Sequence, residues 1–513
     1  MSTKSKFYLD LMTLHPEVTG SLNLCILKLP NGDEKKFIVD CGLFQEREYE
    51  VLNNVLDVSA INIDAAFITH AHIDHIGRLP LLVKMGYTNN IYCTNITKDI
   101  IPTALNDSYK IMKGNCENYS KKIAFKKPLY NKDDVDDTIF LLKAVDYNNS
   151  FFISENLKVT FFANGHLVGA ACILFQASFP GEKDINILFT GDYHKDNVFS
   201  YLPCIPEWVK HLNNLSVVQE ATYGATLSKH IQHCFSVDIP YHISCKHSLF
   251  IPVIALERTS LILLNLKKLQ DDGKLNKAIP IYLDGNLAIT YFNKFKKYTS
   301  VDFIPENLII VNKDIRKDVI LDKRQKIILS TSGMADHGPA QIYLKEFIGR
   351  KDFSIYFTSY TAEGTLGREL MYSNIDDEVK IDNIKFIRKC TISATQEFSS
   401  HAKADELKDF LTQFENISCL LINHGEIWQK QIYSKYIANS LKIKSIKILD
   451  RSTFVRIDSY GFVKSFPSKF ISVQEQQKLS ESMKKHSTVH KTKKEKLKQQ
   501  KTKKRFPVHA YNY

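Results

Sequence analysis

The chain has 513 residues, of which 44% are hydrophobic and 24% are charged, an ordinary composition for a globular protein with two or three domains. None of its 10 cysteines forms a C-x-x-C pair, which argues against a small secreted disulfide scaffold and predicts free thiols in a reducing cytoplasm. The net charge is +12, and +10 of it lies between Lys484 and Arg505, so we expect a basic tail on a nearly neutral folded body.

The sequence predicts neither a secretory signal nor a membrane-spanning segment. The first residues contain no sustained apolar run, so we expect no signal peptide. The most apolar stretch, residues 249–266, includes Glu257 and Arg258 and is too polar to cross a bilayer. We therefore expect a cytoplasmic protein with no membrane partner.

The first informative elements are two short apolar runs that each end in polar residues. Residues 37–39 precede Asp40, and residues 65–68 precede the hexapeptide His-Ala-His-Ile-Asp-His at 70–75. In an extended chain His70 and His72 point the same way, while Asp74 and His75 in the next turn can face a second ion. The hexapeptide therefore predicts a hydrolytic site with two metal ions. The alternative is three histidines in an ordinary polar loop, but chance alone seldom produces so dense a pattern of potential ligands.

Further along the chain, predicted helices alternate with strands, and potential ligands recur at strand ends. The helices are expected at 79–85, 133–143, 259–269 and 404–414. The strands 159–162, 187–189, 215–218 and 420–422 lead to His166, Asp192, Glu220 and His424. Open sheets gather ligands at strand ends, so this repeated position predicts one site. Taken singly, each histidine is more often structural and the glutamate more often an ordinary surface carboxylate.

The alternation of strands and helices predicts an α/β protein in which one domain is inserted into another. The middle of the chain has its own strands, at about 250–254, 279–283 and 327–333, and the ligand-like pattern resumes at His401. We expect a metal domain in two parts, an inserted domain and a disordered basic tail. The predicted metal domain comprises residues 1–207 and 399–470. The inserted domain comprises residues 208–398, and the tail comprises residues 471–513.

Zinc suits a site built from imidazole and carboxylate ligands. Two divalent ions about 3.5–4 Å apart can share a water and lower its pKa towards about 7. We assign three histidines to one ion, a second set to the other ion, and Asp192 to both. The first set is His70, His72 and His166, and the second is Asp74, His75 and His424. Asp40 is expected to orient ligand loops rather than to bind an ion.

Seven sequence motifs in this order resemble those of the metallo-β-lactamase fold, specifically its β-CASP branch of nucleases. Four of them are general to the fold, at 39–45, 69–77, 165–170 and 190–193. Three are specific to the branch, at 220–224, 398–402 and 422–426. The resemblance covers about residues 8 to 450. It implies a four-layer αββα metal domain, an inserted α/β β-CASP domain and an active site in the cleft between them.

The resemblance also implies zinc-dependent hydrolysis of nucleic-acid phosphodiesters. RNA-directed members of the branch resemble this chain in having a histidine at the position of His424, so RNA is the expected substrate. We expect His401 to protonate the departing 3′-oxygen, with Glu220 accepting its other N–H. The predicted catalytic residues are thus Asp74, His401 and Glu220. The predicted cofactors are two Zn²⁺ ions per chain, held by the ligands assigned above.

Several functional alternatives remain open at this point. The leading hypothesis is an endoribonuclease with a two-metal mechanism. The alternatives are a 5′→3′ exoribonuclease of RNase J type, a non-catalytic RNA-binding subunit and a small-molecule hydrolase of the wider superfamily. A homodimer is an expectation from the resemblance alone.

The basic tail is expected to contact the phosphate backbone of RNA without sequence preference. It contains no interleaved aromatic residues, so base stacking is not expected there. A solvated tail or a contact with an acidic partner is the alternative. The candidate RNA-binding residues are Lys484, Lys485, Lys503, Lys504 and Arg505.

Overall fold

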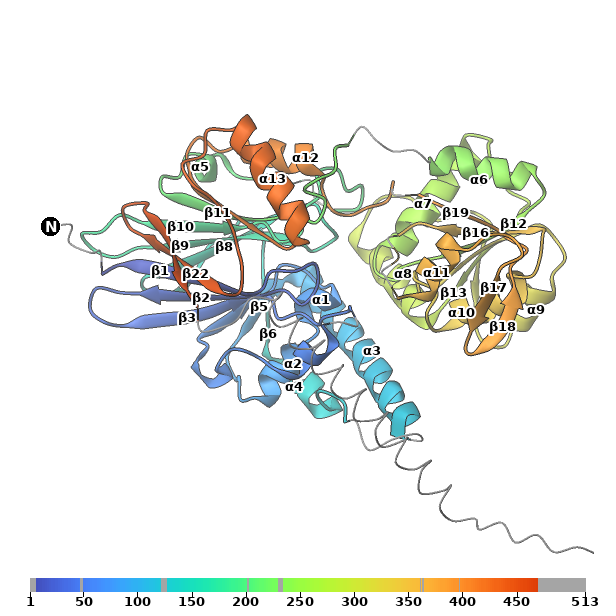
Figure 1. Cartoon of the computed structure of the whole chain (residues 1–513), viewed down its shortest axis with the longest axis horizontal. Helices are drawn as coiled ribbons and strands as arrows, with labels where there is room; N and C mark the ends of the chain where they lie inside the picture. The colour runs from blue at the N-terminus through green and yellow to red at the C-terminus, as the bar shows by residue number, and fades with distance from the viewer. Residues whose placement is uncertain are drawn as a thin grey trace, which may run out of the picture.

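The structure is a computed structural model that describes residues 6–46, 49–120, 127–200, 203–228, 234–359, 361, 364–395 and 397–468. The predicted tail lies outside these residues. Figure 1 shows two lobes. We call the first the two-sheet lobe, described at 6–228 and 397–468, and the second the six-stranded lobe, described at 234–395.

The two-sheet lobe contains two sheets that face each other. The first has the strand order β23-β22-β1-β2-β3-β4-β5-β6, and its central pairs β3–β4 and β4–β5 are parallel. Its strands are β1 (Tyr8–His15), β2 (Leu22–Lys28), β3 (Glu34–Val39), β4 (Ala65–Phe67), β5 (Ile91–Thr94), β6 (Leu142–Val145), β22 (Thr453–Asp458) and β23 (Val463–Pro467).

The second sheet of this lobe has the order β21-β20-β11-β10-β9-β8-β7. Strands β10, β11, β20 and β21 run parallel, and the other pairs are antiparallel. Its strands are β7 (Phe151–Ser154), β8 (Leu157–Ala163), β9 (Ala171–Ala177), β10 (Ile185–Phe189), β11 (Leu215–Glu220), β20 (Ile417–Asn423) and β21 (Ile446–Ile448).

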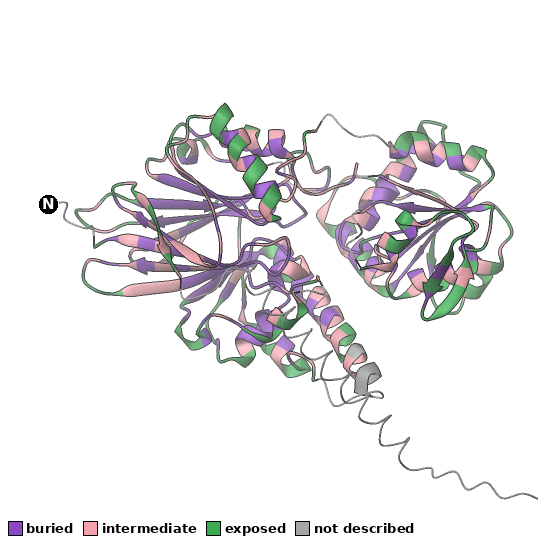
Figure 2. Ribbon diagram, in the orientation of Figure 1, coloured by how far each residue is buried: buried purple, intermediate pink, exposed green. Residues whose placement is uncertain are grey.

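The core of the two-sheet lobe lies between the sheets, where alternating apolar side chains of both meet. The ring of Phe175 stacks on Phe37 with centroids 4.6 Å apart and meets Phe67 edge-on at 4.9 Å. Figure 2 shows the strands of this lobe as its most continuously buried part. The two sheets are therefore held together by ordinary apolar burial, independently of the polar site at their edge.

Helices cover the outer face of each sheet and complete the αββα arrangement that the sequence predicts. The first sheet is covered by α2 (Leu79–Lys84), α3 (Asn95–Ser120) and α4 (Lys132–Leu141), and α1 (Ile73–Ile76) follows β4 directly (Figure 1). The second is covered by α5 (Glu207–Lys210), α12 (Ala404–Leu411) and α13 (Ile427–Ser440). Short 3₁₀ turns occupy Glu50–Asn54 and Ala60–Asn62. The predicted fold class is confirmed.

The six-stranded lobe is a parallel sheet in the order β14-β13-β15-β12-β16-β19 with helices around it. Its strands are β12 (Ser248–Pro252), β13 (Ile281–Asp284), β14 (Leu308–Val311), β15 (Ile327–Ser330), β16 (Phe353–Phe357) and β19 (Thr391–Ala394), beside the hairpin β17 (Glu378–Ile381) and β18 (Ile384–Ile387). Its helices are α6 (Phe235–Ser244), α7 (Arg258–Asp271), α8 (Asn286–Tyr298), α9 (Arg316–Leu321), α10 (Pro339–Phe347) and α11 (Leu366–Tyr372).

Strand β11 differs from the predicted organisation. It follows residue 207, where we expect the inserted domain to begin, yet it pairs with β10 on one side and β20 on the other. All of its residues are buried, so its pattern fits either sheet and does not reveal which one it joins. The sheet pairing therefore puts Glu220 in the two-sheet lobe.

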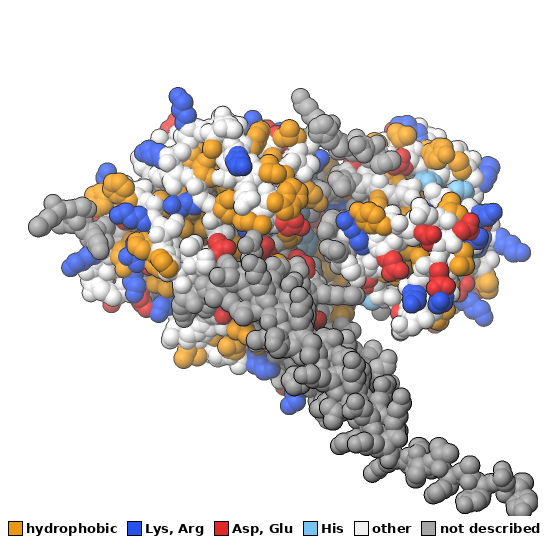
Figure 3. Space-filling model, in the orientation of Figure 1, with side chains coloured by type: hydrophobic (Ala, Val, Ile, Leu, Met, Phe, Trp, Pro, Cys, Tyr) orange, Lys and Arg blue, Asp and Glu red, His pale blue; other side chains and the backbone are white. Residues whose placement is uncertain are grey.

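Two further features concern the helices and the surface charge. No described helix is long and apolar enough to cross a bilayer. On the face seen in Figure 3, Lys and Arg side chains are interspersed with Asp and Glu, as expected of a body with little net charge.

Candidate metal centre

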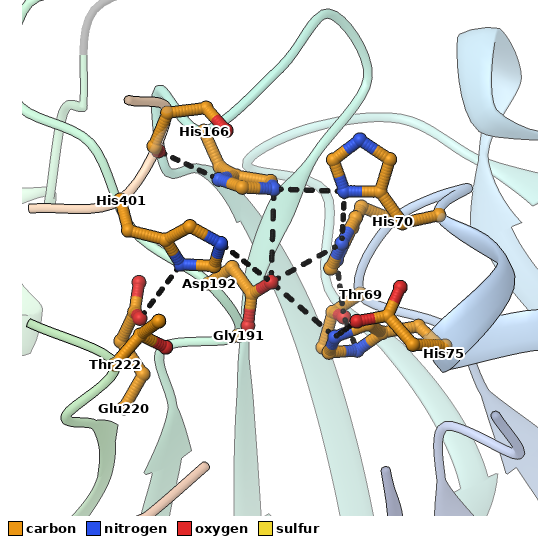
Figure 4. Close-up of polar contacts among 12 residues, drawn as sticks. Thr69, His70, His75, His166, Gly191, Asp192, Glu220, Thr222 and His401 are labelled. Carbon is orange, nitrogen blue, oxygen red and sulfur yellow. Dashed lines mark hydrogen bonds and ion pairs between the residues drawn. The ribbon is translucent and has the colours of Figure 1, made fainter. Parts of the chain in front are cut away.

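The predicted site residues meet at the carboxyl ends of strands, between the two sheets (Figure 4). Asp40 follows β3, and His70 follows β4 after a two-residue gap. His166 and Asp192 lie in the loops after β8 and β10. Glu220 ends β11 and His424 follows β20, whereas Asp74 and His75 lie on α1, a single helical turn. Residues more than 300 positions apart in sequence are thereby brought to one place.

The first group of potential ligands consists of three imidazoles and one carboxylate. The Nδ1 atom of His72 lies 3.1 Å from Nε2 of His70 and 3.1 Å from Nε2 of His166. Oδ2 of Asp192 lies 3.5 Å and 3.7 Å from the Nε2 atoms of His70 and His166. Potential ligand atoms of all four residues are within 4.8 Å of one another, close enough to bind a common ion.

The second group lies on the other side of Asp192. Nε2 of His75 is 3.1 Å from Nε2 of His424, 3.8 Å from Oδ2 of Asp74 and 3.3 Å from Oδ2 of Asp192. The same carboxylate oxygen thus faces both groups, as the bridging assignment requires. All seven predicted ligands are brought together: His70, His72, His166 and Asp192 form one group, Asp74, His75 and His424 a second, and Asp192 and His424 also form a group with Glu220.

The chemistry of both groups fits a bound cation. In four of the five histidines one ring nitrogen is held by an oxygen atom, which fixes the ring; in His424 that nitrogen also lies 3.5 Å from Oδ1 of Asp192. Oδ1 of Asp192 is buried without a hydrogen-bond partner among the described residues. The four holding contacts are His70 with Thr69 Oγ1 (3.0 Å), His75 with Asp40 Oδ2 (2.8 Å), His166 with the carbonyl oxygen of Ser400 (2.8 Å) and His424 with Thr222 Oγ1 (3.1 Å).

Burial keeps two of these histidines neutral, whereas neighbouring carboxylates favour positive charge at a third. Burial lowers the pKa of His72 and of His424 to about 3, so both are neutral and can donate a lone pair. Burial also lowers the pKa of His75, but the charges of Asp192, Asp40 and Asp74 outweigh it and raise that pKa well above its usual value. The second group therefore favours positive charge, which a metal ion would supply.

Asp40 supports the site from outside the two groups. Its carboxylate accepts hydrogen bonds from the backbone N–H of Thr69 (2.9 Å) and from Nδ1 of His75 (2.8 Å). Its backbone φ is +63°, and that of His424 is +43°, a left-handed conformation that is unfavourable for both residue types. Both strained residues directly follow a strand, where the chain turns into the site.

His401 and Glu220 form a separate pair beside the potential ligands. Nδ1 of His401 lies 2.8 Å from Oε2 of Glu220, and its Nε2 lies 3.9 Å from Asp192. The other oxygen of Glu220 accepts the N–H of Tyr193 at 2.5 Å. Burial lowers the pKa of His401, but Glu220 and then Asp192 raise it by more, to about 9. The imidazole is therefore protonated at neutral pH, and its side chain is 21% exposed, so a substrate can reach it.

Sequence reasoning missed four groups that hold the site together. Thr69, Thr222 and the Ser400 carbonyl lie inside recognised motifs, but nothing in their local pattern indicates which histidine each would contact. Asn164 directly precedes a motif. Its side chain accepts the N–H of His166 (3.1 Å) and donates to the carbonyl of Asp192 (2.7 Å), which ties the two ligand loops together.

Gly42 is a position where a single methyl group should disrupt this arrangement. A Cβ atom there would fall 1.4 Å from the carbonyl oxygen of Asp74. We expect Gly42→Ala to destabilise the protein by at least about 3 kcal/mol, because backbone rather than a movable side chain blocks the space. Urea unfolding with a chelator in every sample would measure this loss without the contribution of bound metal.

Gly114→Ala is the matched control for this substitution. Gly114 lies in α3 with open space where its Cβ would be. Replacing it should leave stability unchanged or raise it by up to about 1 kcal/mol. Equal unfolding midpoints for the two variants would contradict the close packing of Gly42 against α1.

Matches to known families cover most of the described chain. Residues 25–144 match the metallo-beta-lactamase superfamily, residues 259–370 the Beta-Casp domain, and residues 387–448 the Zn-dependent metallo-hydrolase RNA specificity domain.

Two relatives match over nearly their whole length, and a longer one over part of it. An "RNase J-like protein" of Methanocaldococcus jannaschii is 28% identical over 80% of this chain and 91% of the relative. "Probable RNase MJ4" of the same organism is 30% identical over 78% of this chain and 90% of the relative. "Transcription termination factor FttA" of Methanosarcina mazei is 26% identical over 74% of this chain but only 62% of that longer relative.

Proposed function

Because this chain belongs to the β-CASP family of ribonucleases within the metallo-β-lactamase superfamily, we propose that it is an endoribonuclease that uses two zinc ions. It is a metal-dependent hydrolase that acts on RNA, in keeping with its RNA specificity domain and its ribonuclease relatives. The proposal adds the number and identity of the ions, the roles of the residues and the mode of cleavage.

The observation that carries the proposal is the convergence of potential ligand atoms from seven buried or half-buried residues on two neighbouring groups, with Asp192 in the first and within 3.5 Å of His75 and His424 in the second. His70, His72 and His166 would hold one ion, and Asp74, His75 and His424 the other. Bound there, two zinc ions would lower the pKa of a water and neutralise charge on the phosphoryl oxygens.

The remaining catalytic step falls to His401 and Glu220. His401 is protonated and partly exposed, so it can donate a proton to the 3′-oxygen as the P–O bond breaks. Glu220 holds the imidazolium through Nδ1 and leaves Nε2 free to face the substrate. Its other oxygen is bound to the Tyr193 backbone, which fixes the direction of the pair.

Endonucleolytic cleavage is proposed because residues 360–364 (Tyr-Thr-Ala-Glu-Gly) resemble endonucleolytic, 3′-processing members of the family. A 5′→3′ exoribonuclease remains the second candidate, because a relative named RNase J-like aligns over most of the chain. Homodimer formation and a cytoplasmic location stay predictions.

A circular RNA separates the two modes of cleavage. We expect the protein to cut a circular RNA and a linear 5′-hydroxyl RNA, and to lose both activities when a zinc chelator removes its ions. The wild-type protein should contain two zinc ions per chain before chelation, as measured by atomic emission. An intact circle beside a 5′-monophosphate RNA shortened from its 5′ end would favour the exonuclease instead.

A further inference from the structure

Glu257, the residue directly before α7, adopts a backbone conformation that is unfavourable for a side chain. Its φ and ψ are +59° and −44°, and the N–H of Arg258 donates to the carbonyl of Leu256 at 2.7 Å across it. This is a γ-turn with positive φ, which is rare and strained for any residue other than glycine. Strain of this kind persists only where surrounding contacts maintain it.

The contacts that maintain it reach across to the other lobe. The carboxylate of Glu257 makes no capping hydrogen bond to its own helix. Oε2 instead accepts the backbone N–H of Val168 at 2.9 Å, and Oε1 accepts the side-chain amide of Asn197. Glu257 is only 8% exposed, so these bonds replace the water that its carboxylate gives up.

Both partners of Glu257 hold the loop that carries His166. Val168 lies two residues after His166, between Gly165 and Gly169, which both have positive φ. The amide of Asn197 that binds Glu257 also donates to the carbonyl oxygen of His166 at 3.1 Å. Oδ1 of Asn197 accepts the N–H of Phe199 at 2.9 Å, so this amide cannot simply turn round.

We propose that Glu257 is a positioning residue through which the six-stranded lobe holds His166 in its ligand position. The inference rests on the proposed metal centre and goes beyond it, because it makes retention of an ion in one lobe depend on a side chain from the other. Docking of the two lobes and completion of the site would therefore be coupled.

Substitutions at Glu257 test this coupling through metal release rather than through activity. Glu257→Gly suits the backbone but removes both hydrogen bonds. We expect its first zinc ion to transfer to a chromogenic chelator about tenfold faster than in the wild type, the effect typical of losing a group that orients a ligand. In Glu257→Gln the side-chain carbonyl oxygen can still accept the N–H of Val168, but the amide N–H₂ group would face the N–H₂ group of Asn197. Its rate of zinc release should therefore lie between those of the wild type and Glu257→Gly.

Lys294→Ala is the matched control, because it breaks another contact between the lobes. Nζ of Lys294 on α8 lies 2.9 Å from Oδ1 of Asp99 on α3, and neither residue contacts His166. Its zinc release should stay within twofold of the wild-type rate. Amide hydrogen exchange should show lost protection at Val168 in Glu257→Gly and unchanged protection there in Lys294→Ala.

The outcomes separate this inference from the proposed function. Equal release rates in Glu257→Gly and wild type, or equal acceleration in Glu257→Gly and Lys294→Ala, would overturn the role of Glu257 while leaving the metal centre in place. A wild-type protein that binds no zinc would overturn the metal centre itself. Faster release confined to the Glu257 variants, with exposure of the Val168 amide, would support the inference.

Discussion

His401→Ala should retain both zinc ions and lose at least about a hundredfold in kcat on RNA. His401 belongs to neither group of potential ligands, so its removal should leave metal content unchanged. A positioned general acid typically contributes a factor of about 10²–10⁴ to the rate. Single-turnover cleavage of a short RNA, with zinc measured on the same sample, would test both parts of the expectation.

A modified substrate distinguishes loss of the acid from general damage to the site. In an RNA with sulfur in place of the 3′-oxygen at the scissile bond, the leaving group is a thiolate, which needs no proton because thiols ionise near pH 8.5. His401→Ala should cleave this substrate at nearly the wild-type rate. A variant that is equally slow on both substrates would remove the assignment of His401 as the acid.

His211→Ala is the control for this substitution. His211 also contacts carboxylates, with Glu207 at 3.1 Å and Glu415 at 2.8 Å, but its side chain is 50% exposed and remote from the potential ligands. Its loss should leave kcat within twofold of wild type, because exposed ion pairs contribute little.

Asp192→Asn should have the largest effect on metal binding of any single conservative substitution. Its carboxylate faces His70, His75, His166 and His424 at 3.3–3.7 Å. Burial raises the pKa of Asp192, but the charges of His424, His75, His401 and His70 outweigh burial and hold it well below the usual value, so the group is charged. An amide keeps the shape and removes the charge that two cations would share.

We expect Asp192→Asn to weaken zinc binding by at least about a hundredfold and to lower kcat/KM by at least about a thousandfold. Competition with a zinc-buffering chelator would give the affinity, and RNA cleavage at saturating zinc the activity. Asp196→Asn, the same change at an exposed residue four positions on, should alter neither. Wild-type zinc affinity in Asp192→Asn would contradict a bridging role for this carboxylate.

Much of the site could be predicted because its chemistry is encoded locally. The hexapeptide 70–75 identifies itself by composition and spacing, and His166, Asp192, Glu220 and His424 each follow a short apolar strand. The carboxyl ends of parallel strands lie at the same edge of a sheet whatever the order of the strands, and β3–β4, β10–β11 and β11–β20 are parallel pairs, so the meeting of these side chains could be expected without the strand order.

Other features depend on which strands become neighbours. All residues of β11 are buried, so its place between β10 and β20 could not be read from periodicity, and the predicted limit at residue 207 separated it from its own sheet. The antiparallel pairing of β1 with β22 joins residues 8–11 to residues 455–458, a contact that no local pattern indicates.

The sequence by itself determined the fold class, the family and the set of potential metal ligands, because side-chain type and short-range spacing carry that information. The tertiary structure decided which nitrogen of each histidine faces the centre, and that the Ser400 carbonyl, Thr222 and Glu257 hold the ligands or their loops. Two of those contacts join residues more than 200 positions apart, and only the packing of sheets and lobes brings them within hydrogen-bond distance.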